Sequence, residues 1–143
     1  MRNIMNVLLI VGFVAVVAAV ACQAVEAPAA EKEARIFELR TYTTHPGKLD
    51  DLHKRFRDHT CELFKKHGME MIGYWTPADE PESENTLIYI LAFPSREARN
   101  KAFDAFRNDP AWQKAFKESR ADGPIVEKVE SKFITPTDYS PMR

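Results

Sequence analysis

The segment Leu87–Phe93 (LIYILAF) constrains the fold more than any other, because it is apolar on both faces. Its alternation predicts a strand with one set of side chains on each face: Leu87, Tyr89, Leu91 and Phe93 on the first, Ile88, Ile90 and Ala92 on the second. A face of an antiparallel sheet that meets water is usually polar. The second apolar face therefore predicts a cover, and a second copy of the same sheet across a two-fold axis is the simplest one.

Alternating residues predict three further strands, over 36–42, 69–76 and 126–134, and the first is broken by His45-Pro46-Gly47. Helical spacing predicts a helix over 48–67, whose apolar stripe is Leu49, Leu52, Phe56, Thr60, Leu63 and Phe64. Its other face carries pairs of opposite charge at i,i+4 spacing, which are Asp50–Lys54, Asp51–Arg55, Lys54–Asp58 and Glu62–Lys66.

Two helices follow the apolar strand. Ser95 is suited to cap the first of them, whose apolar stripe is Ala98, Ala102, Ala105 and Phe106, with Phe103 beside it. Asp109-Pro110 is typical of the start of a helix and opens a short third one. The order βαββα(α)β predicts an α+β class fold, a ferredoxin-like four-stranded antiparallel sheet that forms a dimeric α+β barrel with its copy.

Residues 1–21 predict an export signal. Arg2 is the only charge among them, and the segment from Val7 to Ala21 is apolar or Gly throughout. Ala19-Val20-Ala21 fits an ordinary cleavage site, while Cys22 directly after it resembles the lipidated cysteine of a bacterial lipoprotein, although Ala19 stands where Leu is usual. An uncleaved membrane anchor is the alternative, because the uncharged stretch is long enough to span a bilayer. We expect an exported protein, periplasmic, in the cell envelope or secreted, that contacts a membrane only through this segment or a lipidated Cys22.

Residues 22–34 are rich in Ala, Glu and Pro and predict a linker, so that the globular domain covers residues 35–141. The formal net charge of −1 gives no electrostatic case for binding nucleic acid. Cys22 and Cys61 are the two cysteines, and Cys61 lies within a helical apolar pattern, where a core thiol is the usual role. A bridge between them is conceivable, but no spacing supports it.

No motif predicts a metal or a cofactor. His53, His59 and His67 lie on one helix at steps of six and eight residues, and these steps do not bring them together on one metal. The sequence has no G-x-S-x-G elbow, no Gly-rich phosphate loop and no C-x-x-C pair, so hydrolase, kinase and dinucleotide-binding functions have no support.

The remaining candidate site is a polar row on the first strand, Glu38, Arg40 and Tyr42, whose neighbours Phe37, Leu39 and Thr41 lie on the opposite face. The row is either a buried ion pair with a tyrosine that serves the dimer seam, or a polar site in the barrel cavity. Aromatic walls of such a site are Tyr74, Trp75 or Tyr89, and His45 lies in a turn that can reach the barrel mouth.

The apolar neighbours of the row are the better match to the helix stripes, so we expect the polar row to face the dimer cavity. Replacing Arg40 with alanine is then expected to weaken the dimer or unfold the chain more than Lys54→Ala does.

Three separated motifs resemble the NIPSNAP family. They are Glu38-Leu39-Arg40 with Tyr42 and Pro46-Gly47-Lys48, then Ser95 with Arg99 and Asp109-Pro110 with Trp112, and finally Pro136-Thr137 with Ser140-Pro141. The resemblance spans residues 35–141. It implies a dimeric α+β barrel, a superfamily that also contains cofactor-free monooxygenases, small haem-degrading enzymes and lactone isomerases. The family's own activity is poorly defined, and the vesicle-traffic and mitochondrial roles of its animal members fit an exported chain badly.

The sequence favours an exported homodimeric binding or scaffold module for a small molecule or a protein, without a cofactor. The ligand expected is small and apolar or contains a carbonyl. The alternative is a cofactor-independent monooxygenase- or isomerase-like enzyme, in which Tyr42, Arg40 and His45 polarise a carbonyl or enol. A third reading is a structural envelope protein tethered by Cys22. An enzyme should contain a closed apolar cavity of ligand size, whereas a scaffold should have that space filled by side chains.

Overall fold

The computed structural model describes residues 35–142. The predicted signal, Cys22 and the whole predicted linker lie outside the described residues. Within residues 35–142, no helix is both long and apolar enough to cross a membrane.

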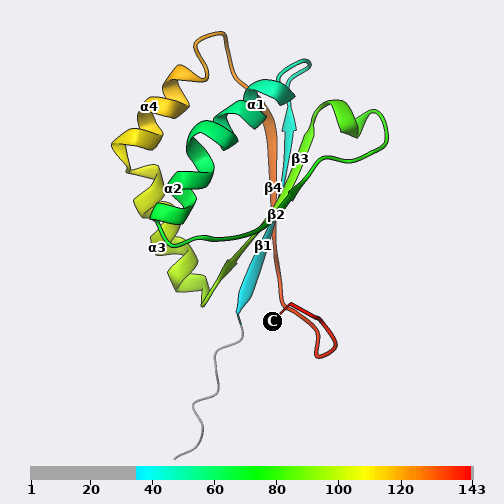
Figure 1. Cartoon of the computed structure of the whole chain (residues 1–143), viewed down its shortest axis with the longest axis vertical. Coiled ribbons are helices and arrows are strands. Elements are labelled where there is room, and N and C mark those ends of the chain that lie inside the picture. Colours follow the sequence, from blue (N-terminus) through cyan, green and yellow to red (C-terminus); the bar gives the residue numbers. More distant parts are fainter. Residues whose placement is uncertain (1–34, 143) are drawn as a thin grey trace, which may run out of the picture. The chain divides into compact units, whose positions relative to one another are not determined.

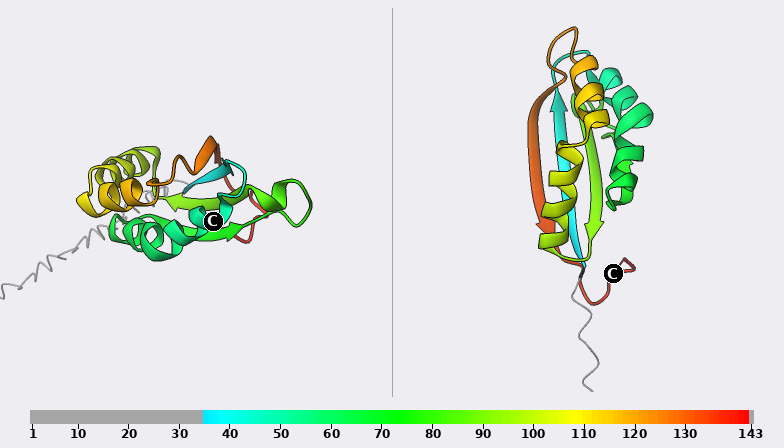
Figure 2. Two further views of the ribbon diagram at one scale, coloured as in Figure 1. Left: turned by 90° about the horizontal axis from the view of Figure 1, so that it is seen from above. Right: turned by 90° about the vertical axis from the view of Figure 1, so that its left-hand side faces the viewer.

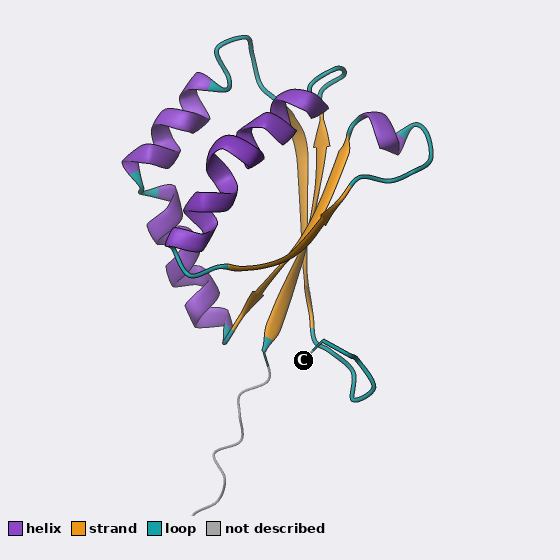
Figure 3. Ribbon diagram, in the orientation of Figure 1, coloured by secondary structure: helices purple, strands orange, loops and turns teal. Residues whose placement is uncertain are grey.

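The sheet has four antiparallel strands, as the sequence predicts. They are β1 (Ile36–Thr44), β2 (Glu70–Trp75), β3 (Thr86–Phe93) and β4 (Val126–Ile134), and their order across the sheet is β2-β3-β1-β4. Figure 1 shows the sheet edge-on with the helices on one side of it, and Figure 3 gives the same view by element type. The two central strands, β1 and β3, are paired along almost their whole length, from Ile36 opposite Phe93 to Thr43 opposite Thr86.

The helices cover one face of the sheet and leave the other open (Figure 2). They are α1 (Leu49–Arg55), η1 (Phe56–Thr60), α2 (Cys61–Lys66), α3 (Arg96–Arg107) and α4 (Pro110–Glu118), with a short 3-10 turn, η2 (Glu82–Glu84), in the loop between β2 and β3. The predicted order βαββα(α)β is confirmed. This arrangement gives the sheet a helix face and an outer face, which must be considered separately.

The predicted helix starts at Ser95 and Asp109 are confirmed. The Ser95 hydroxyl accepts a hydrogen bond from the Ala98 N–H at 3.1 Å, and Asp109 Oδ1 accepts one from the Ala111 N–H at 2.9 Å. Asp109 does more than cap α4. Its Oδ2 accepts from Lys66 Nζ at 2.6 Å and lies 2.8 Å from His67 Nε2, so one buried carboxylate joins the end of α2 to the start of α4.

The helix predicted over 48–67 is not α-helical throughout, because η1 is a π-helical turn between α1 and α2. The Cys61 N–H donates to the Phe56 carbonyl, five residues back, and the Thr60 hydroxyl donates to the Arg55 carbonyl at 3.2 Å. The predicted apolar stripe is nevertheless buried along its whole length. The sequence predicts Arg55 on the solvated face, and this prediction is wrong, because Arg55 is only 5% exposed.

The core lies between the helix face and the helices and is rich in aromatic rings. Phe64 is 2% exposed and contacts four other rings, those of Phe56, Tyr89, Phe103 and Phe106, at centroid distances of 4.9–6.2 Å. Cys61 is half-buried against this core, in keeping with the predicted core thiol. Ala105, predicted to belong to the stripe of α3, is exposed, because the buried face of α3 is centred on Phe103 and Phe106.

The outer face keeps an apolar strip. Leu39, Ile88 and Ile90 are half-buried there, and Trp75, beside Ile88 on β2, is 49% exposed. One end of this face is covered by the chain itself: Phe37 and Ala92 are buried, and Phe37 shares a small cleft with residues of the C-terminal segment, Thr135, Pro136, Ser140 and Met142. The cover that the sequence predicts for β3 is therefore partly intramolecular. Ile90 also borders this cleft, and the strip that remains runs from Ile90 over Leu39 and Ile88 to Trp75.

Candidate functional site

The polar row of β1 points toward the helices, so the prediction that it faces a dimer cavity is wrong. The strand register sets the row opposite three buried residues of β3, pairing Glu38 with Leu91, Arg40 with Tyr89 and Tyr42 with Leu87. The reason is a charge on the helix layer. Arg99 of α3 donates to Glu38, so the helices supply the counter-ion for this carboxylate. The match between apolar residues of β1 and the apolar stripes of the helices does not take this charge into account.

Glu38 is fully enclosed, and four hydrogen bonds converge on its carboxylate. Arg99 forms a two-pronged contact, with Nε 2.7 Å from Oε2 and Nη2 2.6 Å from Oε1. Arg40 Nη1 and the Ser131 hydroxyl of β4 also donate to Oε1, each at 2.6 Å. Burial alone would raise the pKa of Glu38, but the bonds from Arg99, Ser131 and Arg40 outweigh it and lower the pKa below its ordinary value. The carboxylate is thus ionised and fully engaged by the protein.

The row continues from Arg40 into two tyrosines. Arg40 Nη2 donates to the Tyr42 hydroxyl at 3.2 Å, and the Tyr89 hydroxyl donates to the same oxygen at 3.0 Å. Tyr89 is completely buried, and this burial is the main cause that raises its pKa. Tyr42 is half-buried and lines a cleft described below, so it is the member of the row that connects the buried network to the surface.

The other predicted site residues divide between the two faces. Tyr74 belongs to the helix face, where it stacks on Tyr89 with ring centroids 5.4 Å apart, and burial raises its pKa. Trp75 follows Tyr74 on β2 and is half exposed, and it lines a cleft, described below, together with Tyr74. His45 lies in the turn after β1, where its backbone N–H donates to the Ile125 carbonyl at 3.0 Å. The structure therefore brings Glu38, Arg40, Tyr42, Tyr74 and Tyr89 together; Trp75 joins Tyr74 at the third cleft only, and His45 lies outside the group.

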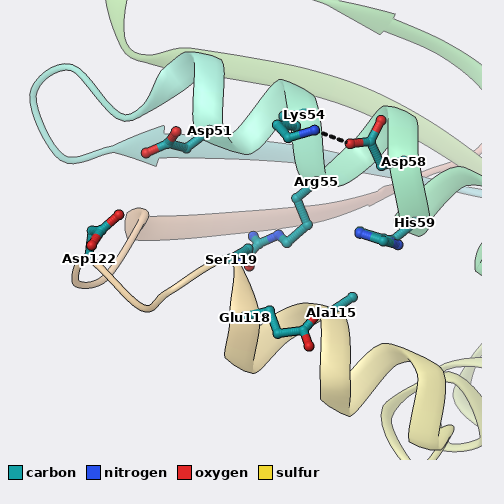
Figure 4. Close-up of a pocket in the computed structure, with 9 residues that line it drawn as sticks. All are labelled: Asp51, Lys54, Arg55, Asp58, His59, Ala115, Glu118, Ser119 and Asp122. Carbon is teal, nitrogen blue, oxygen red and sulfur yellow. Dashed lines mark hydrogen bonds and ion pairs between the residues drawn. The ribbon is translucent and has the colours of Figure 1, made fainter.

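Half-open clefts border the helices, and three of them, all lined by described residues, lie near the predicted site residues. The first, which we call the acidic cleft, has a volume of about 320 Å³ and separates α1 and η1 from α4; it is lined by Asp51, Lys54, Arg55, Asp58, His59, Ala115, Glu118, Ser119 and Asp122 (Figure 4). The second, which we call the arginine cleft, has a volume of about 270 Å³ and is lined by Tyr42, Arg55, Phe116, Arg120, Ile125, Val126, Glu127 and Val129. The third, of about 290 Å³, lies beside Cys61 and Tyr74.

Sequence reasoning missed the residues that complete the site. Arg99 and Ser131 complete the shell around Glu38, and Arg55 and Arg120 line the arginine cleft. A signal for Arg55 is present: it follows Leu52 by three positions and precedes Phe56, so it belongs to the buried stripe by spacing alone. Within residues 35–142 no group of three His, Cys, Asp or Glu side chains is placed to hold a metal ion.

Comparison with known proteins agrees with the predicted resemblance. The NIPSNAP family description matches residues 37–141. A NipSnap homolog of Dictyostelium discoideum is 29% identical over 104 residues, which are 73% of this chain and 44% of that protein. A putative NipSnap protein of Caenorhabditis elegans is 23% identical over 113 residues, 79% of this chain and 20% of that protein. This chain therefore spans less than half the length of the curated relatives it matches.

Solved structures give the same result for the fold. A NIPSNAP family protein of unknown function from Agrobacterium tumefaciens superposes with a TM-score of 0.67 at 26% identity, covering 78% of this chain and 96% of that one. SnoaB, a cofactor-independent oxygenase from Streptomyces nogalater, superposes with a TM-score of 0.52 at 14% identity, covering 76% and 98%. The second likeness concerns the fold alone.

Proposed function

This protein belongs to the NIPSNAP family, and on that premise we propose that it is an exported homodimeric module that binds a small molecule without transforming it. The observation that carries the proposal is the engagement of Glu38. Its hydrogen bonds come from Arg99, Arg40 and Ser131, three of them to Oε1 and one to Oε2, and the side chain is fully enclosed, so a substrate cannot reach it as a general base must be reached. The aromatic rings of the core fill the space between the sheet and the helices, and the clefts lie at its border.

The alternative, a cofactor-independent oxygenase- or isomerase-like enzyme, is favoured by the fold shared with SnoaB. In this chain such chemistry would have to use Tyr42, because it is the member of the polar row that borders a cleft. Mass spectrometry of the purified protein under native conditions separates the two functions. A binding module retains an unchanged molecule in proportion to the chain, whereas an enzyme releases an altered one when that molecule is added back.

The dimer is supported by the outer face. The apolar strip of Leu39, Ile88 and Ile90 runs beside β4, whose outer-facing residues alternate in charge as Lys128, Glu130 and Lys132. Such an alternating row pairs opposite charges with a second copy when the two-fold axis passes between neighbouring charges, so that Lys128 of one copy faces Glu130 of the other. A second copy would therefore cover the strip and pair its own charges across the seam.

Ile90→Arg tests this dimer. The new guanidinium projects from the outer face, so the single chain should still fold, but in a dimer it would be buried without a partner. We expect the dimer dissociation constant to rise by about a hundredfold or more, measured by sedimentation velocity at micromolar concentration. Val129→Arg is the control, because it places the same charge on the helix side of the sheet, at a position that is 47% exposed. A monomeric wild-type protein, or an Ile90→Arg variant that sediments like wild type, would contradict the proposed dimer.

Export is supported by the apolar run after Arg2 and the small residues before Cys22. We expect the mature chain to begin at Cys22, with or without attached lipid, so the intact mass of the soluble and membrane fractions should lack residues 1–21. A mature protein that still begins at Met1 would argue against cleavage and in favour of an anchor.

A further inference from the structure

Arg55 is a buried cation that forms no ion pair with any carboxylate of residues 35–142. It is only 5% exposed, and its Nε has no hydrogen-bond partner within residues 35–142. Among the described residues its guanidinium has one hydrogen bond, a long one from Nη1 to the Ser119 hydroxyl at 3.5 Å. Figure 4 shows the side chain reaching from α1 toward Ser119, and the carboxylates around it make no drawn contact with it. A charged group in this position is costly to the fold, so its retention calls for a function.

A second cation lies next to it. The Arg55 guanidinium stands over the rings of Trp112 and Phe116, at 5.6 and 5.4 Å from their centroids, and the Arg120 guanidinium stands over the same Phe116 ring at 4.8 Å. Burial lowers the pKa of Arg55; Tyr42 opposes this change, and Arg120 adds to it. Two guanidiniums on one aromatic ring repel each other, and an anion between them would remove that repulsion.

Arg55 borders two clefts of opposite character. In the acidic cleft it and Lys54 face four carboxylates, those of Asp51, Asp58, Glu118 and Asp122. In the arginine cleft it and Arg120 face one carboxylate, that of Glu127, and the other walls are Tyr42, Phe116, Ile125, Val126 and Val129. An anion would be repelled from the first cleft and attracted to the second. The second also offers an aromatic and branched apolar lining.

We propose that the arginine cleft binds a small molecule with one carboxylate attached to an aromatic or branched apolar body. The planar fork of Arg55 matches a carboxylate, Arg120 closes over it, and the hydroxyl of Tyr42 can add a hydrogen bond. The walls of Phe116, Ile125 and Val129 hold the apolar part in a space of about 270 Å³. This inference rests on the proposed binding function and names its ligand class, but it does not depend on the dimer.

Benzoate is a suitable probe for titration calorimetry with the purified mature protein. Benzyl alcohol tests the ring without the charge, and inorganic phosphate tests the charge without the ring. We expect one benzoate per chain, bound at least about tenfold more tightly than either control. Equal affinity for benzyl alcohol or for phosphate would overturn the proposed ligand class.

Arg55→Met keeps the length of the side chain and removes its charge. We expect benzoate affinity to fall at least about tenfold while the thermal midpoint stays at the wild-type value or rises, because a buried charge without a partner is removed. Arg107→Met, at an exposed position of α3, should change neither property. A large drop in the midpoint of Arg55→Met would assign Arg55 a structural role and overturn the proposal, as would unchanged benzoate binding.

Arg120→Met provides an independent variant, because Arg120 is exposed and its loss should leave the fold intact. It should also weaken benzoate binding, and wild-type affinity here would overturn the two-arginine site. Native mass spectrometry separates this inference from the broader proposal. A retained molecule without a carboxylate would refute the ligand class and keep the binding function, whereas no retained molecule and no benzoate binding would refute both.

Discussion

Replacing Arg99 with alanine should lower the free energy of unfolding by about 3 kcal/mol, the lower end of what a broken buried ion pair costs. Arg99 supplies two of the four hydrogen bonds to Glu38, and Arg40 alone would then neutralise a carboxylate that is completely enclosed. Urea denaturation monitored by tryptophan fluorescence and by circular dichroism gives the value, provided that the two transitions coincide.

Arg107→Ala is the matched control, because Arg107 lies on the same helix, is exposed, and pairs only with Asp104 three residues earlier. Its loss should cost less than about 1 kcal/mol. If Arg99→Ala were as stable as Arg107→Ala, the network around Glu38 would contribute nothing to the fold. Arg40→Ala should also destabilise each chain, and since Arg40 faces the helices, we no longer expect a specific effect on the dimer.

Glu38→Gln should have an even larger effect at neutral pH, with a loss of about 3–5 kcal/mol, because it leaves two guanidiniums facing each other without an anion. The effect should depend on pH. The pKa of Glu38 is lowered from 4.5 in the folded protein, so the stability that its charge contributes is fully present above pH 4.5 and is lost as the pH falls through the folded value.

The stability gap between wild type and Glu38→Gln should therefore be constant from about pH 5 to pH 8 and narrow below about pH 4.5. Urea titrations at several pH values measure it. The corresponding change at the exposed Glu62 should give a gap near zero at every pH. A Glu38→Gln gap that stayed constant down to pH 2 would show that the charge of Glu38 contributes little and that its shape and hydrogen bonds contribute most.

The fold could be predicted from the sequence because each element is marked locally. β4 has the predicted bounds, and the capping hydroxyl of Ser95 and carboxylate of Asp109 start helices where their side chains predict them. Local pattern also identified the apolar stripe of the first helix, all of which is buried.

The site could be predicted only in part, because its charges are neutralised across the chain. Glu38 and Arg40 are two residues apart, but Arg99 is 61 residues and Ser131 93 residues from Glu38. Periodicity sorts residues by face and does not show which cation meets which anion, so the polar row was assigned to the wrong side of the sheet. Arg55 was misplaced for a related reason: its neighbour Asp51 suggests a solvated pair, whereas Asp51 bonds to Lys48 instead.

The π-helical turn η1 has a consequence for how the first helix fits the rest of the fold. Each residue of an α-helix advances the direction of its side chain by about 100°, and a π turn holds one residue more than an α turn. The side chains of α1 and α2 are therefore rotated about the helix axis relative to their positions in a continuous α-helix. Arg55 of α1 extends to Ser119 at the end of α4, while Phe64 of α2 packs on Tyr89 at the centre of the sheet. Removal of one residue from η1 would make the helix uniform and turn one half by about 100° relative to the other. The extra residue thus changes the direction of the side chains about the helix axis, so that one helix contacts both the aromatic core and α4.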